Sequence, residues 1–169
     1  MRKIFLILLL MTTSSLFAEE APPIPCSADE HRQFDFWLGH WTSYSKEGKK
    51  QGTNHLTKLM GQCVIQENWQ SGGGKFTGTS FNFYDPARKE WHQTWVDSGG
   101  GTLRLDGGLV GGSMQLSGHR KRPNGDTVVE RITWTPMEDG RVRQHWQAST
   151  DEGKNWTQVF DGYYQREED

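Results

Sequence analysis

Glycine-rich turn sequences recur through most of the chain and limit what it can fold into. From residue 45 onward, stretches such as "KEGKKQG", "SGGGK", "YDPARK" and "RPNGD" interrupt short runs of alternating apolar and polar residues. Glycine, Asn-Gly and Asp-Gly supply the positive φ angles that tight hairpin turns need. Their spacing of roughly 8–13 residues is typical of consecutive antiparallel strands, not of strands that alternate with helices. We therefore predict a mainly β fold of about ten strands, at 40–46, 53–60, 62–70, 75–84, 89–97, 102–108, 113–120, 126–135, 141–149 and 155–165.

A meander of this kind leaves two strand edges exposed unless the sheet closes on itself. Closure removes the edges, so we expect an antiparallel up-and-down β-barrel, with a β-sandwich as the alternative. Residues 107–112 ("GGLVGG") are the weakest part of the strand pattern and predict a bend or a bulge.

The first residues have the three-part pattern of a secretory signal. A basic start is followed by the apolar run 4–11 and a small, polar segment that ends at Ala18. The run is too short to span a bilayer, which needs about 20 apolar residues. We therefore predict a signal peptide at 1–18 and a single domain at 19–169, periplasmic or secreted and soluble after cleavage, without stable membrane insertion.

Charge argues against two classes of partner. The chain has 19 basic and 21 acidic residues. Removing Arg2 and Lys3 with the signal leaves 17 − 21 = −4. No basic stripe remains, so we expect neither nucleic acid nor anionic membrane as a partner; protein partners stay unknown.

A short helix is expected in front of the strands, at 29–38. Asp29 is the expected N-cap, and Phe34, Trp37 and Leu38 share one face at helical spacing.

The hydrophobic composition explains why aromatic residues should dominate the core. Leu, Ile, Val and Phe make up only about 15% of the mature chain, but all eight tryptophans lie in it. Large rings can replace an aliphatic core because each buries about 150–250 Å².

The two cysteines, Cys26 and Cys63, form an even count in a protein with an export signal. A disulfide is the natural expectation in an oxidising compartment, and two unpaired buried thiols are the alternative.

Several predicted strands place large rings and polar groups on the same face. In "WHQTWVD", Trp91, Gln93, Trp95 and Asp97 share one side of the strand. We interpret such faces as the wall of a lumen that binds a small, partly apolar ligand. The predicted ligand-binding residues are the rings Trp69, Tyr84, Trp95, Trp134 and Trp146 and the polar groups Glu67, Asn82, Gln93, Arg131 and Gln144.

Two other functions stay open. One is an enzyme that acts on a small substrate or glycan with Glu67 or Asp97 as the acid or base; an inward Glu67 close to Arg131 would form an ion pair first. The other is an interaction module that docks through an aromatic outer face. The chain has no nucleophile motif, no phosphate loop and no paired-histidine motif, so we assign no catalytic residue, metal or cofactor.

Two short motifs have structural interpretations. Ser149-x-Asp151-x-Gly153-x-x-Trp156 is similar to an Asp-box, in which the aspartate bonds the backbone of a hairpin tip and the tryptophan packs inward. It occurs once, so a propeller of repeated blades is not indicated.

Gly39-x-Trp41 resembles the opening of calycin barrels such as lipocalins. There the tryptophan closes one end of the barrel and packs on an arginine near the last strand, a role open to Arg166 or Arg143.

The wider pattern carries a family resemblance. "FDFWLGHW", "GQCVIQENW", "TSFNFYD", "WHQTWVDSGG" and "RITWTP" follow one another along the chain. In this order they resemble a family of small exported bacterial proteins, a domain of unknown function whose signature is the "FDFWLG-x-W" opening. The resemblance covers roughly residues 31–166. It implies a calycin-like β-barrel, with Trp37 and Trp41 as structural residues at its end.

Overall fold

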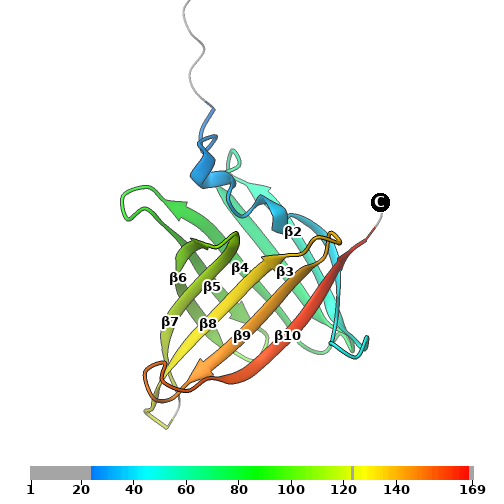
Figure 1. Ribbon diagram of the computed structural model, residues 1–169, viewed down its shortest axis with the longest axis vertical. Helices are drawn as coiled ribbons and strands as arrows, with labels where there is room; N and C mark the ends of the chain where they lie inside the picture. The colour runs from blue at the N-terminus through cyan, green and yellow to red at the C-terminus, as the bar shows by residue number, and fades with distance from the viewer. Residues whose placement is uncertain (1–23, 123, 168–169) are drawn as a thin grey trace, which may run out of the picture.

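The computed structural model describes residues 24–122 and 124–167, which form one closed antiparallel barrel (Figure 1). Each strand pairs with its neighbours in sequence, and β1 closes the barrel by pairing with β10. The strands are β1 (Gly39–Tyr44), β2 (Lys50–Leu59), β3 (Val64–Ser71), β4 (Thr77–Asp85), β5 (Glu90–Asp97), β6 (Thr102–Val110), β7 (Ser113–Lys121), β8 (Thr127–Pro136), β9 (Val142–Ser149) and β10 (Thr157–Arg166). The predicted barrel is confirmed, and the sandwich alternative is wrong. The predicted signal peptide, 1–18, lies outside the described residues.

Every predicted strand has a counterpart, and the largest boundary error is at β2, predicted from 53 and observed from Lys50. The segment 107–112 differs from the prediction. β6 continues through Gly107 and Gly108, and the reversal is a two-residue turn at Gly111 and Gly112, with φ of 56° and 82°. Positive φ at both central positions matches the right-handed twist of the flanking strands, which is why the strands continue up to the turn.

The predicted single helix is instead two short 3-10 turns, η1 (Asp29–Arg32) and η2 (Asp35–Trp37). The residue before η1 is Ala28, so Asp29 lies in the first turn and does not cap it. Phe34 separates the two turns, with φ −106° and ψ 9°. A 3-10 turn aligns side chains three positions apart, and Phe34 and Trp37 both enter the barrel.

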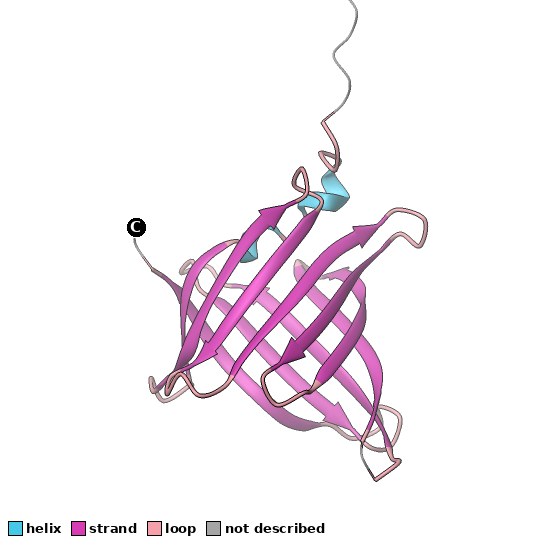
Figure 2. Ribbon diagram, turned by 180° about the vertical axis from the view of Figure 1, so that it is seen from behind, coloured by secondary structure: helices cyan, strands magenta, loops and turns pink. Residues whose placement is uncertain are grey.

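This N-terminal segment plugs one end of the barrel (Figure 2). Phe34 packs edge-on against Trp91 and Trp134, with centroid distances of 5.6 and 5.2 Å. Trp37 packs against Trp41 at 5.3 Å. Phe34 and Trp37 are 0% and 1% exposed, so both rings of the plug are buried in the end of the barrel. The buried core combines these rings with aliphatic side chains, among them Leu56, Leu105 and Leu116.

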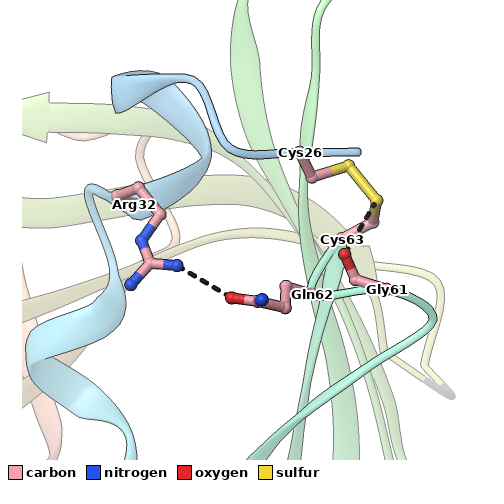
Figure 3. Close-up of a disulfide and its surroundings, with 5 residues drawn as sticks. All are labelled: Cys26, Arg32, Gly61, Gln62 and Cys63. Carbon is pink, nitrogen blue, oxygen red and sulfur yellow. Dashed lines mark hydrogen bonds between the residues drawn. A yellow bond between two sulfur atoms is a disulfide. The ribbon is translucent and has the colours of Figure 1, made fainter. Parts of the chain in front are cut away.

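A disulfide between Cys26 and Cys63 fixes the plug to the β2–β3 turn (Figure 3). The predicted bond is confirmed, and the alternative of two free thiols is wrong. Arg32 Nη1 also donates a hydrogen bond to Gln62 Oε1 at 2.9 Å, so two contacts hold the plug to the same turn. Within the two described ranges, no helix is long and apolar enough to cross a membrane.

Candidate functional site

A cavity of about 200 Å³ lies in the part of the barrel away from the plug. Three kinds of side chain line it: the aromatic residues Trp69, Phe76, Trp95, Trp146, Phe160 and Tyr164, the aliphatic residues Leu103, Ile132 and Val159, and the polar residues Glu67, Gln93 and Gln144. Phe76 follows the end of β3 and Val159 lies near the start of β10, both at the end opposite the plug. They are 40% and 49% exposed. The cavity therefore reaches solvent at this end.

Glycines in the wall make room for the rings that line the cavity. A Cβ at Gly78 would lie 2.7 Å from Trp95 Cε2 and closer still to two other atoms of that ring. A Cβ at Gly52 would lie 2.9 Å from Trp69 Cζ2. A side chain at Gly78 would displace the Trp95 indole. One at Gly52 would collide first with the backbone oxygen of Gln70 and then with Trp69, so glycine at these positions makes room for the two rings.

Carboxylates hold two of the indoles in a fixed orientation. Trp146 Nε1 donates to Glu130 Oε2 at 2.7 Å, and Trp95 Nε1 donates to Asp97 Oδ2 at 3.3 Å. Glu130 is 0% exposed, and Arg120 Nε donates to its other oxygen at 2.9 Å. Arg120, whose side chain is 38% exposed, balances the charge of the buried Glu130, and the charge-assisted bond from Trp146 restrains that ring in the cavity wall.

A chain of buried polar groups crosses four neighbouring strands on the opposite wall. Glu67 on β3 accepts hydrogen bonds from Asn54 Nδ2 and from Ser80 Oγ, both at 2.7 Å. Asn82 Nδ2 donates to Ser80 Oγ at 2.8 Å, and Gln93 Nε2 donates to Asn82 Oδ1 at 2.9 Å. The amide and hydroxyl donors are used within the chain, so acceptor oxygens dominate this side of the cavity.

Glu67 is 3% exposed and is the one acidic residue among the side chains that line the cavity. Burial raises the pKa of its carboxyl, and the hydrogen bonds from Ser80 and Asn54 offset only part of that effect. Burial, and then the nearby Glu67 charge, also raise the pKa of the Tyr164 hydroxyl. Among residues 24–122 and 124–167, no lysine, arginine or histidine forms an ion pair with Glu67.

The wall formed by β8 and β9 holds two polar atoms without partners. Gln144 Oε1 and Trp134 Nε1 are buried, and neither has a hydrogen-bond partner within the described part of the chain. The two residues are register partners across the strands. Leaving such groups unpaired is costly. Gln144 lines the cavity, so its oxygen offers an acceptor to a bound group, whereas Trp134 does not line the cavity.

Of the ten predicted ligand-binding residues, six line the cavity: Glu67, Trp69, Gln93, Trp95, Gln144 and Trp146. Asn82 lies behind them in the polar chain. Tyr84 and Trp134 lie toward the plugged end, where Tyr84 packs on His31 at 5.2 Å.

The inward placement of Arg131 is wrong. It alternates with the buried Glu130 and Ile132, so it faces outward. Its guanidinium lies 3.9 Å from the ring centroid of Trp156, and its Nη2 donates to Gln147 Oε1 at 2.9 Å. The ion pair with Glu67 considered from the sequence therefore does not form.

Sequence reasoning missed Glu130, Phe76, Phe160 and Tyr164. The sequence does contain a signal for Glu130. In "VVERITW" it shares a strand face with Val128, Ile132 and Trp134, and an otherwise apolar face indicates burial. A signal for Phe76 was also present, because the predicted strand 75–84 places it on the same face as Asn82.

The Gly39-x-Trp41 opening has a defined geometry. The guanidinium of Arg166 stacks on Trp41 at 4.2 Å from the ring centroid, and its Nη1 donates to Leu38 O at 2.7 Å. Gly39 has φ of 119°, and a Cβ there would collide with the Arg166 guanidinium. Arg143 instead pairs with Asp161 at 2.8 Å. Arg166 is thus the arginine on which Trp41 packs.

The segment from Ser149 to Trp156 is a rigid hairpin tip. Asp151 Oδ1 accepts from Asn155 N at 2.8 Å and from Ser149 Oγ at 2.7 Å. Bonds from Asn155 lower the pKa of Asp151 to about 2. Gly153 has φ of 87°, and Trp156 lies under the Arg131 guanidinium on the outside of the barrel. This tryptophan packs on the outer wall and does not enter the core.

Across the described ranges, no group of three or more His, Cys, Asp or Glu side chains is placed to hold a metal ion. The sequence matches no known protein family and no curated protein. The function is therefore argued from the cavity alone.

Proposed function

We propose that the protein is exported and binds one small, partly apolar molecule in its barrel lumen. The observation that carries this proposal is the cavity of about 200 Å³ with aromatic walls and three polar groups. Small-molecule sites combine apolar walls with a few polar groups that fix orientation. An apolar cavity of about 150 Å³ in another protein holds benzene. A ligand with the bulk of one ring, or slightly more, fits this space.

Rigidity of the walls supports binding over mere incomplete packing. The Glu130 and Asp97 carboxylates restrain Trp146 and Trp95, and glycine at position 78 keeps space beside one of these rings. A cavity with restrained walls loses little conformational entropy when a ligand binds. The predicted signal peptide and the disulfide support export, because disulfides persist in oxidising compartments.

We also propose that the barrel is calycin-like and that the chain belongs with the exported family whose opening is "FDFWLG-x-W". The stacking of Arg166 on Trp41, beside a glycine that tolerates no side chain, supports this assignment. An experimental structure of a family member tests it: the same glycine, tryptophan and arginine should meet at the plugged end. A different arrangement there would contradict the assignment.

The test of ligand binding is native mass spectrometry of protein purified from its own host, followed by melting curves with a panel of compounds of one-ring size. A ligand that binds the native state raises Tm with concentration. Leu103→Trp fills the cavity and should abolish both the retained mass and the Tm shifts. Arg104→Trp is the matched control, because Arg104 is the exposed neighbour on the same strand. Equal responses of the two variants would contradict binding in the lumen.

An enzyme is the second candidate function, favoured by the raised pKa of Glu67 in a cavity. Asp97 is less suited to that role: its Oδ1 accepts from the backbone N–H groups of Gly99 and Gly101, and it does not line the cavity. A substrate-dependent turnover that Glu67→Gln abolishes would support the enzyme. The docking module has less support, because a docking module is expected to have a filled lumen and this lumen contains a cavity.

A further inference from the structure

We propose that the lumen selects small organic cations, with the ammonium group of the ligand against Glu67 and its carbon substituents against the tryptophan rings. This inference rests on the proposed function, binding in the lumen, and specifies the chemical class of the ligand. It follows from three features of the cavity: an uncompensated carboxylate, aromatic walls, and the absence of a basic residue among the lining side chains.

The first feature is the carboxylate. Glu67 is almost fully buried and lines the cavity, yet its two hydrogen-bond donors, Asn54 and Ser80, are neutral. Buried carboxylates are normally paired with a cation. Arg120 is already paired with Glu130. In the described part of the chain Glu67 has no cationic partner, so a cationic ligand would supply the missing charge.

The second feature is the ring content of the walls. Trp69, Trp95, Trp146, Phe160 and Tyr164 line the same cavity as Glu67. The faces of aromatic rings carry negative potential and attract cations, tryptophan most strongly, and cages of such rings recognise quaternary ammonium groups. Neutral ligands also pack against rings, but they leave the Glu67 carboxylate unpaired.

The third feature, the lack of a basic residue in the cavity wall, disfavours anionic ligands. None of the twelve lining residues is lysine, arginine or histidine. A carboxylate or phosphate ligand would be desolvated beside Glu67 without a positive group to pair with it, which is unfavourable at short range in a low-dielectric site. The volume of about 200 Å³ restricts the ligand to a small head group, such as trimethylammonium with a short chain.

The experiment compares two probes of nearly equal shape, choline and its neutral isostere 3,3-dimethylbutan-1-ol, by isothermal titration calorimetry at neutral pH. Wild-type protein should bind choline at least tenfold more tightly than the isostere. Glu67→Gln should weaken choline tenfold or more and change binding of the isostere less than twofold. Glu90→Gln is the control: it removes a carboxylate that does not line the cavity, and should behave as wild type.

The outcomes separate the inference from the proposed function. Equal binding of both probes to wild-type protein, both lost in Leu103→Trp, would overturn cation selection and leave lumen binding intact. Binding of neither probe at millimolar concentration would also overturn it, while the neutral panel above decides lumen binding independently. A choline preference that survives in Glu67→Gln would overturn the role of the carboxylate. The comparison of the two probes in wild-type protein stands even where the Gln variant fails to fold.

Discussion

Gly78→Ala is the substitution that most directly tests the geometry of the cavity wall. The added Cβ would lie 2.7 Å from Trp95 Cε2 and nearer to two atoms of the six-membered ring, well inside van der Waals contact. The indole must therefore move by about 1 Å or more into the cavity and weaken its 3.3 Å bond to Asp97. Overpacking of this kind costs about 1–3 kcal/mol, which lowers Tm by roughly 2–12 °C in a domain of this size.

The assay is urea unfolding with near-UV circular dichroism, which reports the tryptophan environment. Gly108→Ala is the matched control, since a Cβ there meets nothing within 4 Å and its φ is compatible with alanine. We expect that control to be neutral or more stable by about 0.4–1 kcal/mol, because alanine restricts the unfolded chain.

A second background isolates the clash itself. Trp95→Phe removes the ring atoms that the new methyl group at position 78 would meet, so Gly78→Ala should cost at least about 1 kcal/mol less in that background than in wild type. Equal costs in the two backgrounds, or a Gly78→Ala protein as stable as Gly108→Ala with an unchanged near-UV spectrum, would refute the reasoning. The cavity would then not be shaped by the contact between Gly78 and Trp95.

Three further predictions concern charge, the disulfide and the closed end. Burial raises the native pKa of Glu67 above its unfolded value, so its contribution to stability is full below about pH 4 and is lost as pH rises toward the raised pKa. The free energy of unfolding of Glu67→Gln should therefore increase relative to that of wild type as pH rises from about 4 to about 8, measured by urea titration. A difference that stays constant over this range would contradict the prediction. The double substitution Cys26→Ser and Cys63→Ser removes a disulfide of sequence separation 37. It should lower the free energy of unfolding by about 4 kcal/mol relative to wild type measured without reductant. A loss below about 1 kcal/mol would show that the disulfide contributes little to stability. Arg166→Met keeps an unbranched apolar stem but removes the guanidinium, with its hydrogen bond to Leu38 and its stacking on Trp41. The substitution should cost about 1–3 kcal/mol; an unchanged urea midpoint would count against the contact.

The strands were predictable because alternation and turn chemistry agree along the whole chain. Tight turns need glycine or asparagine at defined positions, and pairs such as Gly111 and Gly112 are visible in the sequence. The N-terminal helix was less predictable: spacing placed Phe34 and Trp37 on one face, but only the barrel end determines that the segment forms two 3-10 turns. Tertiary packing overrides local preference in so short a segment.

The site was predictable in part for a physical reason. Residues such as Gln93 and Trp95 share a strand face, so alternation could group them, but alternation alone does not say which face is inside. Arg131 lies on the opposite face from the buried series Glu130, Ile132 and Trp134, so the same alternation that groups those residues places Arg131 outside. Contacts between neighbouring strands, such as Trp146 on β9 with Glu130 on β8, depend on the register of the two strands and leave no local trace in the sequence.

The plug has a consequence for exchange. Phe34 and Trp37 fill one end of the barrel, and the disulfide fixes their segment to the β2–β3 turn. A ligand bound as proposed would therefore enter and leave at the opposite end, past Phe76 and Val159. Substitutions at the plugged end should then alter stability and leave the dissociation rate of such a ligand unchanged.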